Sequence, residues 1–332
     1  MSVKIGINGF GRIGKLVFRL IESNPELEIV HINDKMEIDL MAHLLKYDTL
    51  HGKFDGTIEI KDNYLIVKGS KVLVTKQESP DIIDWHSSGA DIVIDSSGKF
   101  KTRDILSKHL QNGAKKVILS SPPTAGEDIK TIVMGVNNSI IENYDDIISN
   151  ASCTTNCIST VLKVLLDNFG IENAFMNTVH PFTNNQNLQD GYHKDFRRAR
   201  SAYGNIIPTT TSAVKTSVIV LPELKGKFDG FATRVPVADC SYVELTAQLS
   251  SKVTVEMINN AFRTASEGHM QKYLEYCEEP IVSSDITNNT HSAIYDALST
   301  KVLGGNFVQI LAWYDNESGY SNRIIDLIKY IT

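Results

Sequence analysis

The feature that most constrains the fold is a glycine-rich turn near the start of the chain, "GFGRIG" at residues 9–14. An apolar run at residues 3–9 precedes it, which is typical of a β-strand, and apolar residues at helical spacing follow it. A second apolar run, residues 27–34, comes next. Strand, helix and strand in about 30 residues make a right-handed βαβ unit, so the sequence predicts a parallel sheet with covering helices.

Each glycine of this turn has a physical role in a dinucleotide-binding site. Gly9 permits a tight turn, Gly11 lets the backbone approach a pyrophosphate, and Gly14 lets the helix pack closely on the strand. Asp34, about 20 residues further on, is placed to accept hydrogen bonds from ribose hydroxyls and to repel a 2′-phosphate. The pattern predicts NAD rather than NADP as cofactor, against the alternative of an ordinary glycine-rich turn followed by a solvated aspartate.

Length and charge exclude several classes of protein. A chain of 332 residues exceeds what one hydrophobic core usually supports, so we expect two domains. The net charge of −6 does not indicate a nucleic-acid partner, and no apolar run approaches the ~18 residues of a membrane-spanning helix. No signal-peptide pattern is present, and the four cysteines show neither paired nor metal-binding spacing. We expect a cytoplasmic protein with free thiols, no metal and no membrane partner.

The remaining patterns of the first half extend the parallel sheet. Apolar runs at residues 90–100, 116–123 and 131–137 predict strands, and residues 102–116 predict an amphipathic helix. Three short runs between residues 56 and 76 predict antiparallel strands. We therefore expect an α/β fold with a Rossmann dinucleotide-binding domain over residues 1–150.

A different pattern begins at "SNASCTTNC", residues 149–157. The residues that follow predict a helix with Ser152 or Cys153 at its N-terminal edge, where the helix dipole and free N–H groups lower the pKa of a thiol. His180 ends the next predicted strand, and the returning chain would bring its imidazole beside the thiol as a base. The alternatives are a packed thiol, as we expect for Cys157, and a hydrogen-bonded histidine at a strand end.

Cationic and hydroxyl side chains downstream are typical of an anion site. A polar loop holds Arg197, Arg198 and Arg200 before Thr209 to Thr211, and Arg234 interrupts an apolar strand. Guanidinium groups and hydroxyls suit phosphate, and a buried arginine needs a counter-charge from a ligand or a carboxylate. The alternative for the arginine loop is a solvated or subunit-contact segment.

Long strands and helices fill the rest of the second half. They predict an α+β catalytic domain over residues 151–316, with a mixed, largely antiparallel sheet covered by helices. The amphipathic tail, residues 317–332, predicts a helix that packs back on the Rossmann domain.

Seven stretches together resemble the phosphorylating glyceraldehyde-3-phosphate dehydrogenase family from end to end: "INGFGRIG", "KYDTLHGKF", "SNASCTTNC", "TVHPFTNNQ", "NIIPTTT", "TRVPV" and "WYDNESGYS". The resemblance implies a homotetramer that oxidises D-glyceraldehyde 3-phosphate with NAD and inorganic phosphate to 1,3-bisphosphoglycerate. It places the nucleophile on Cys153 and the histidine that activates it on His180.

The same resemblance assigns the binding residues. It implies cofactor contacts, besides the three glycines, at Arg12, Ile13, Asp34, Glu78, Ser120 and Asn316, the last holding the nicotinamide carboxamide. It implies phosphate-binding positions at Ser152, Thr154, Thr183, Arg198, Thr211, Ser212 and Arg234. Residues 183–206 resemble the family's S-loop, which would reach the cofactor of a neighbouring subunit.

The chain also departs from the family pattern. Ser318 stands where a tryptophan is usual, Ser212 where glycine is usual, and Glu78 where a basic residue is usual. Gly191 and Tyr192 replace a Leu-Pro pair that helps to exclude NADP, so the expected preference for NAD depends mostly on Asp34. The open alternatives are an erythrose-4-phosphate dehydrogenase, an NADP-using biosynthetic form, and a non-catalytic protein of the same fold.

Overall fold

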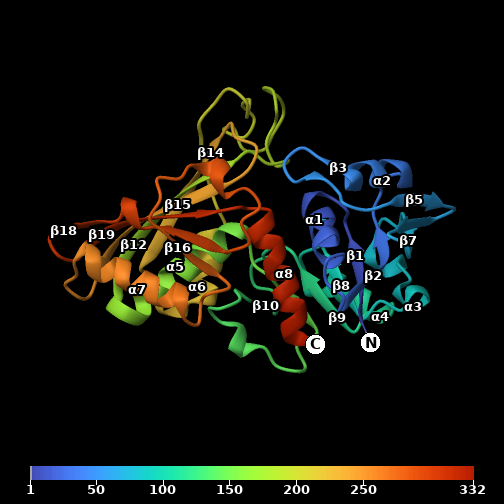
Figure 1. Ribbon diagram of the computed structural model, residues 1–332, viewed down its shortest axis with the longest axis horizontal. Helices are drawn as coiled ribbons and strands as arrows, with labels where there is room; N and C mark the ends of the chain where they lie inside the picture. The colour runs from blue at the N-terminus through green and yellow to red at the C-terminus, as the bar shows by residue number, and fades with distance from the viewer. Residues whose placement is uncertain (1) are drawn as a thin grey trace. The chain divides into compact units, whose positions relative to one another are not determined.

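The computed structural model describes residues 2–332 and divides into two compact units (Figure 1). The first unit contains the residues up to Ile132, Ser139–Ala151 and Ser321–Thr332, and the second contains Val133–Asn138 and Ser152–Tyr320. Each unit has its own sheet. No helix within residues 2–332 is long and apolar enough to cross a membrane.

The sheet of the first unit is mostly parallel. Its strands are β1 (Val3–Asn8), β2 (Leu27–Asn33), β5 (Ile58–Lys61), β6 (Tyr64–Val67), β7 (Ser70–Thr75), β8 (Ile92–Asp95), β9 (Lys116–Leu119), β10 (Lys130–Thr131) and β11 (Ile147–Ser149). Their order is β10-β11-β9-β8-β1-β2-β7-β6-β5, and only the pairs β7–β6 and β6–β5 are antiparallel. The chain winds outward from β1 in both directions, which confirms the doubly wound Rossmann fold.

Helices flank this sheet. They are α1 (Arg12–Ile21), α2 (Ile38–Lys46), α3 (Trp85–Ser88), α4 (Arg103–Gln111) and most of α8 (Ser318–Ile331), and a small ribbon, β3 (Tyr47–Asp48) with β4 (Gly52–Lys53), follows α2. The predicted first helix is confirmed, because α1 starts directly after Gly11 and buries Leu16, Val17 and Ile21. Two apolar clusters, around Trp85 and around Leu106, form part of the core.

The prediction of a strand over residues 131–137 is wrong. Of residues 131–137, only Thr131 belongs to a strand, β10. Beyond it the chain turns, because Val133 donates its N–H to Asn137 Oδ1 while its carbonyl accepts the N–H of Val136. The sheet gains instead the three-residue strand β11, which lies between β9 and β10 and is too short to give a sequence pattern.

The second unit is built on an eight-stranded mixed sheet. Its strands are β12 (Ile171–Pro181), β13 (Ile207–Thr209), β14 (Phe228–Val235), β15 (Ser241–Leu249), β16 (Leu274–Cys277), β17 (Ala293–Asp296), β18 (Lys301–Leu303) and β19 (Phe307–Tyr314). The order is β13-β14-β12-β15-β19-β17-β16, with β18 also paired to β19. All pairs are antiparallel except β12–β14 and β16–β17, which confirms the expected mixed, largely antiparallel sheet.

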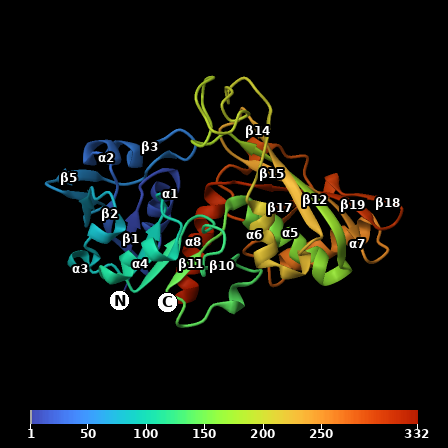
Figure 2. The same ribbon diagram turned by 180° about the vertical axis from the view of Figure 1, so that it is seen from behind.

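Three helices cover one face of this sheet (Figure 2). They are α5 (Cys153–Phe169), α6 (Ala213–Val220) and α7 (Val255–Glu267). Among the described residues there are also five short 3₁₀ helices, η1 (Pro80–Ile82), η2 (Asn138–Ile140), η3 (Pro222–Leu224), η4 (Ser283–Ile286) and η5 (Ala297–Ser299). Helix α5 contacts the central strands β12, β15 and β19, so its first turn is held against the middle of the sheet.

Candidate active site

The glycine-rich turn has the geometry that a bound pyrophosphate requires. Gly9 adopts φ +97°, and a Cβ there would lie 2.4 Å from the backbone nitrogen of Ser97. A Cβ on Gly14 would lie 2.2 Å from the carbonyl oxygen of Gly9, so the helix can approach the strand only with glycine at this position. A Cβ on Gly11 would meet nothing within 4 Å, which leaves open space in front of the N-terminus of α1.

Asp34 lies beside this turn, directly after β2. Its Oδ2 accepts the N–H of Phe10 at 2.6 Å and its Oδ1 accepts the N–H of Met36 at 2.9 Å. These two backbone donors fix the carboxylate at the point where strand β2 ends. The carboxylate is partly exposed, so a lone pair of each oxygen is left for a ligand hydroxyl.

The other expected cofactor residues of the first unit lie at the same edge of the sheet. Ser120 directly follows β9 and donates its N–H to the carbonyl of Asp95, and Glu78 follows β7. Because β1, β2, β7 and β9 run parallel, their carboxyl ends meet at one edge. Arg12, in the first turn of α1, binds both oxygens of Asp48 at 2.6 and 3.2 Å, and Ile13 follows it. Glu78 forms an exposed ion pair with Lys35 at 3.3 Å.

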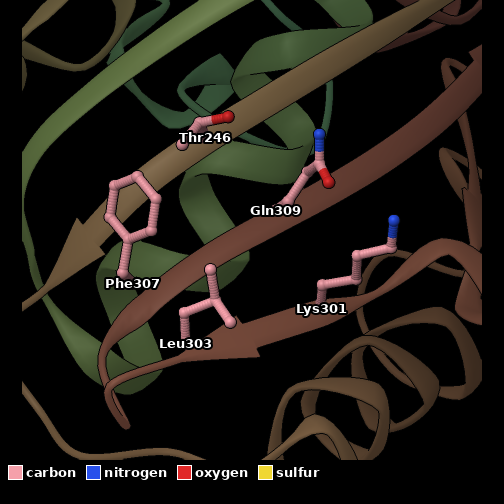
Figure 3. A pocket seen from close by; sticks show the side chains of 5 residues that line it. All are labelled: Thr246, Lys301, Leu303, Phe307 and Gln309. Carbon is pink, nitrogen blue, oxygen red and sulfur yellow. The ribbon is translucent and has the colours of Figure 1, made fainter.

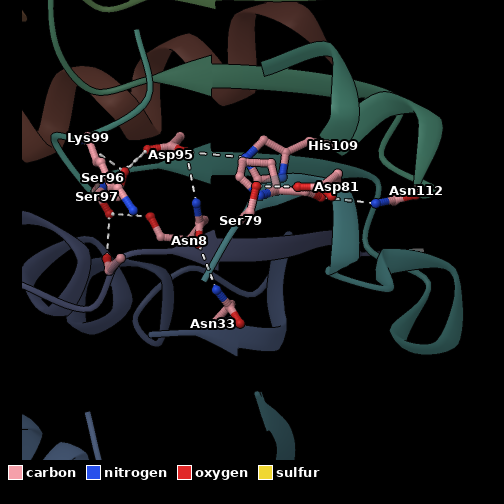
Figure 4. Close-up of polar contacts among 12 residues, drawn as sticks. Asn8, Asn33, Ser79, Asp81, Asp95, Ser96, Ser97, Lys99, His109 and Asn112 are labelled. Atoms are coloured by element: carbon pink, nitrogen blue, oxygen red, sulfur yellow. Dashed lines mark hydrogen bonds and ion pairs between the residues drawn. The ribbon is translucent and has the colours of Figure 1, made fainter. Parts of the chain in front are cut away.

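A buried polar network supports this edge of the sheet, and no pattern in the sequence indicated it (Figure 4). Asp95 accepts hydrogen bonds from Asn8 Nδ2 at 2.9 Å and from the hydroxyl of Ser97 at 2.6 Å. His109 Nε2 lies 3.2 Å from the same carboxylate, and its Nδ1 is 2.9 Å from Trp85 Nε1. Since an indole nitrogen can only donate, Nδ1 of His109 accepts and Nε2 carries the proton. The network fixes the ends of β1 and β8.

In the second unit, Cys153 is the first residue of α5. Ser152 is the N-cap, and its hydroxyl accepts the N–H of Thr155 at 3.1 Å. Ala151, just before the cap, adopts a left-handed φ of +58°, which is uncommon for a residue with a side chain. The predicted helix start is confirmed, and the thiol lies at the positive end of the helix dipole. Cys157, one turn later, is fully buried, as expected for a packing residue.

His180 lies next to this thiol. It is near the end of β12 and is 5% exposed, and its Nε2 is 3.6 Å from the sulfur of Cys153. The returning strand therefore brings the imidazole to the thiol, as the order of helix and strand predicts. The other ring nitrogen, Nδ1, lies 2.9 Å from the carbonyl oxygen of Pro181 and 2.6 Å from Nη1 of Arg234.

Tyr314 connects the two elements that carry this pair, and sequence reasoning missed it. Its hydroxyl shares a hydrogen bond with the hydroxyl of Thr154 at 2.8 Å and another with that of Thr178 at 2.9 Å. Thr154 follows Cys153 on α5, and Thr178 lies two residues before His180 on β12. The tyrosine ring also packs edge-on against His180. A tyrosine at the end of the apolar strand β19 is the only sequence signal that could have indicated this role.

The pKa values of the pair follow from burial. Burial raises the pKa of the Cys153 thiol above its ordinary value, and attraction to the cation of Arg234 offsets part of this shift. Burial and repulsion from Arg234 lower the pKa of His180 to about 3. Both shifts favour the neutral thiol and the neutral imidazole. The expected lowering of the thiol pKa is therefore wrong, because burial outweighs the helix N-terminus.

Two arginines gather near this pair. Arg198 donates from Nε to the hydroxyl of Thr209 at 2.9 Å and from Nη2 to the carbonyl of Thr210 at 3.0 Å. Strand β13 places Thr209 beside β14, which carries Arg234. Arg197 and Arg200 form polar contacts within their own loop region. Arg197 donates a hydrogen bond to the carbonyl of Pro208, and Arg200 forms an ion pair with Asp190.

The other residues expected to bind phosphate, and Asn316, already form hydrogen bonds within the second unit. Ser152 and Thr154 use their hydroxyls within α5 and toward Tyr314. Thr211 accepts the N–H of Ala213, and Ser212 is the N-cap of α6, with no side-chain bond to the helix. The carbonyl of Thr183 accepts the N–H of Gln186. Asn316 accepts the hydroxyl of Ser241 at 2.8 Å, which orients its side-chain amide.

Comparisons with known proteins agree with these arrangements. The family model for the NAD binding domain of glyceraldehyde 3-phosphate dehydrogenase matches residues 3–103, and the model for its C-terminal domain matches residues 152–316. The glyceraldehyde-3-phosphate dehydrogenase 1 of Bacillus subtilis is 50% identical to the chain over 335 residues. The glyceraldehyde-3-phosphate dehydrogenases of Priestia megaterium and Geobacillus stearothermophilus are 51% and 50% identical. Each alignment covers 100% of the chain and 98% of the relative.

Proposed function

Because the chain belongs to the glyceraldehyde-3-phosphate dehydrogenase family, we propose that it oxidises D-glyceraldehyde 3-phosphate to 1,3-bisphosphoglycerate with NAD and inorganic phosphate. The observation that carries the proposal is the distance of 3.6 Å between the sulfur of Cys153 and Nε2 of His180, at the N-terminus of α5. A thiol, a base and helix N–H donors at one point are the groups that covalent aldehyde oxidation needs.

The residues of the first unit fit NAD. The open space at Gly11 suits a pyrophosphate at the helix N-terminus, and the anchored carboxylate of Asp34 suits ribose hydroxyls. When bound, NAD accepts the hydride that the substrate carbon gives up. We assign its contacts to Gly9, Gly11, Arg12, Ile13, Gly14, Asp34, Glu78, Ser120 and Asn316.

Cys153 forms the bond to the substrate. Its sulfur attacks the aldehyde carbon while the thiol proton moves to Nε2 of His180, since burial disfavours a free thiolate. The N–H groups of the first turn of α5 face the resulting oxygen. Nε2 then returns the proton to that oxygen, and the product of this step is a hemithioacetal on Cys153.

His180 then acts on the oxygen of this intermediate. The hydroxyl proton of the hemithioacetal passes to Nε2 while the carbon gives up its hydride, which bound NAD would accept, and the carbon becomes that of a thioester. An oxygen of inorganic phosphate attacks the thioester carbon, the carbon–sulfur bond breaks, and the sulfur of Cys153 leaves with the electron pair. Capture on the sulfur divides one difficult oxidation into two easier steps.

The phosphate groups bind in the second unit. We assign them to Ser152, Thr154, Thr183, Arg198, Thr211, Ser212 and Arg234. Arg234 has no carboxylate partner within residues 2–332, and Arg198, whose Nε lies 3.7 Å from Oδ2 of Asp195, adds a second cation near it. These cations support an anion at this point. Because the relatives carry the name glyceraldehyde-3-phosphate dehydrogenase, neither an erythrose 4-phosphate enzyme, nor an NADP-using form, nor a non-catalytic protein is favoured.

We further propose that the chain works in the cytoplasm as a homotetramer, with domains at residues 1–150 plus 317–332 and at 151–316. On the sheet face opposite the helices, Phe175, Phe231, Leu303 and Phe307 are 46–67% exposed. Near two of them lies a hollow of about 190 Å³, lined by Thr246, Lys301, Leu303, Phe307 and Gln309 (Figure 3). The S-loop, residues 183–206, also exposes large apolar side chains. Such a surface is typical of a subunit interface.

The test is an assay of NADH formation with glyceraldehyde 3-phosphate and NAD. We expect sustained turnover with inorganic phosphate and at most a single round of NADH formation without it, because the thioester then has no acceptor. The variant Cys153→Ser should lose activity, while Cys277→Ser, at a partly exposed cysteine on β16, should keep it. Full activity of Cys153→Ser would refute the proposal. Subunit number is measured separately by light scattering.

A further inference from the structure

The ring nitrogen Nδ1 of His180 has two hydrogen-bonding neighbours, of which one is an acceptor and the other a donor. The carbonyl oxygen of Pro181, at 2.9 Å, can only accept a hydrogen bond. Nη1 of Arg234, at 2.6 Å, can only donate one. A neutral imidazole cannot satisfy both, because Nδ1 either carries a proton or offers a lone pair.

Each choice fixes the opposite side of the ring, which faces the sulfur of Cys153. When Arg234 donates to Nδ1, the ring proton lies on Nε2, and Nε2 cannot take a proton from the thiol. When Nδ1–H donates to Pro181, Nε2 has a free lone pair and can act as the base. The neighbour that engages Nδ1 therefore decides whether His180 can perform its step.

The surroundings of Arg234 are typical of an arginine that binds an anionic ligand. Within residues 2–332, its guanidinium has no carboxylate partner, and its buried Nε has no hydrogen-bond partner. The hydrogen-bond partners of Nη1 in this part of the chain are the carbonyl of Pro181, at 2.7 Å, and Nδ1 of His180. Burial, with added repulsion from Arg198, lowers the pKa of Arg234, so this half-buried cation lacks a full counter-charge within residues 2–332.

We propose that Arg234 is a positioning residue that holds His180 in the Nε2–H form until an oxyanion engages the guanidinium. The proposal rests on the function given above, since the oxyanion would be a phosphate group of the reaction. An oxyanion drawing Nη1 toward itself leaves Nδ1 to donate to Pro181. One proton is lost from Nε2 to water and one is gained at Nδ1, so the charge of the ring is unchanged. The base then forms only when a phosphate group is bound.

The test measures the rate at which iodoacetamide alkylates Cys153, followed by mass spectrometry of its peptide between pH 5 and 10. The full-length protein is used without NAD or aldehyde. Sodium sulfate and glycerol 3-phosphate, each against sodium chloride at equal ionic strength, distinguish free anion from phosphate ester. We expect one or both to accelerate alkylation about tenfold at neutral pH, which corresponds to about one unit in the apparent thiol pKa.

The sign of the effect separates this proposal from simple electrostatics. An anion that only neutralised Arg234, or blocked access to the sulfur, would slow alkylation. Slower or unchanged alkylation with both anions would therefore overturn the proposal. The charged groups near the pair are Arg234 on β14, Arg198 before β13 and Glu317 after β19, and the titratable but neutral group is Tyr314 on β19.

Two variants and one spectroscopic measurement complete the test. The variant Arg234→Leu should lose the anion response, while Arg200→Leu, which removes an exposed ion pair with Asp190 in the same loop, should keep it. Nitrogen-15 spectra of histidine-labelled protein, assigned with His180→Asn, read the tautomer directly even if Arg234→Leu does not fold. We expect the proton of His180 to move from Nε2 to Nδ1 on adding the anion, and an unchanged tautomer contradicts the proposal. Normal NADH formation with no anion effect would refute this inference alone.

Discussion

The hydroxyl of Tyr314 offers the sharpest test of how the catalytic pair is held. The change is Tyr314→Phe, which removes one oxygen from a side chain that is 1% exposed. Thr178 keeps a hydrogen bond to the carbonyl of Tyr242 at 3.2 Å, but the hydroxyl of Thr154 loses its hydrogen bond to the tyrosine oxygen and keeps no oxygen partner among residues 2–332, only the Cys153 sulfur. A lost hydrogen bond costs about 0.5–1.5 kcal/mol and a buried hydroxyl without a partner about 1–3 kcal/mol, so we expect a loss of about 2 kcal/mol.

The measurement is the unfolding temperature by calorimetry. For a unit of this size, ~2 kcal/mol corresponds to a decrease of about 4–8 °C. We also expect kcat to fall by about tenfold or more, because Cys153 and His180 lose the link that sets their distance, while KM changes little. Neither the ring nor its packing against His180 is altered, so the effect isolates the hydroxyl.

The matched control is the double variant Tyr314→Phe with Thr154→Val. Removing both partners leaves no unsatisfied hydroxyl on Thr154, so the double variant should be more stable than the sum of the single changes by about 1 kcal/mol. Additive effects, or an unfolding temperature of Tyr314→Phe within about 1 °C of wild type, would show that Tyr314 does not link α5 to β12.

Three further predictions concern NAD binding and pH. Gly14→Ala should destabilise the first unit by about 1–3 kcal/mol, because the new Cβ would lie 2.2 Å from the carbonyl oxygen of Gly9. Gly11→Ala should unfold at the wild-type temperature but bind NAD more weakly in titration calorimetry. Equal effects of the two variants on stability and on NAD binding would contradict the roles assigned to these glycines. The low pKa of His180, about 3 against an ordinary 6.5, means that only the unfolded chain takes up its proton in this interval. The contribution of His180 to the free energy of unfolding is therefore fully present above pH 6.5 and is lost as the pH falls toward 3. His180→Asn should reduce the slope of unfolding free energy against pH by about 1.4 kcal/mol per unit, and an unchanged slope would place the titration elsewhere. Asp34→Ala should raise kcat/KM with NADP relative to NAD by about tenfold or more, because it removes the charge that repels a 2′-phosphate; an unchanged ratio would mean that Asp34 does not set the preference.

The local elements of the fold were predictable because their signals are local. The glycine-rich turn specifies a strand before it and a helix after it, and β1 and α1 have the expected positions. Ser152 caps the helix that starts at Cys153, and the single strand that follows carries His180 back to it. Here chain order alone determines which side chains meet.

What the sequence did not predict depends on distant parts of the chain. The three residues of β11 form a strand only because β9 and β10 flank them. Tyr314 follows Thr154 by 160 positions, and no pattern in either segment points to the other. The predicted direction of the thiol pKa shift was wrong for the same reason, because the packing around the half-buried Cys153 is a property of the folded sheet and not of the helix end.

The central claim is that the sulfur of Cys153 carries the substrate through the reaction. The most direct measurement is mass spectrometry of the protein quenched in acid after mixing with NAD and glyceraldehyde 3-phosphate in the absence of inorganic phosphate. We predict a phosphoglyceroyl group on the peptide that contains Cys153, lost on incubation with phosphate and missing from Cys153→Ser. NADH formation without this adduct, or an adduct on a different residue, would contradict the account.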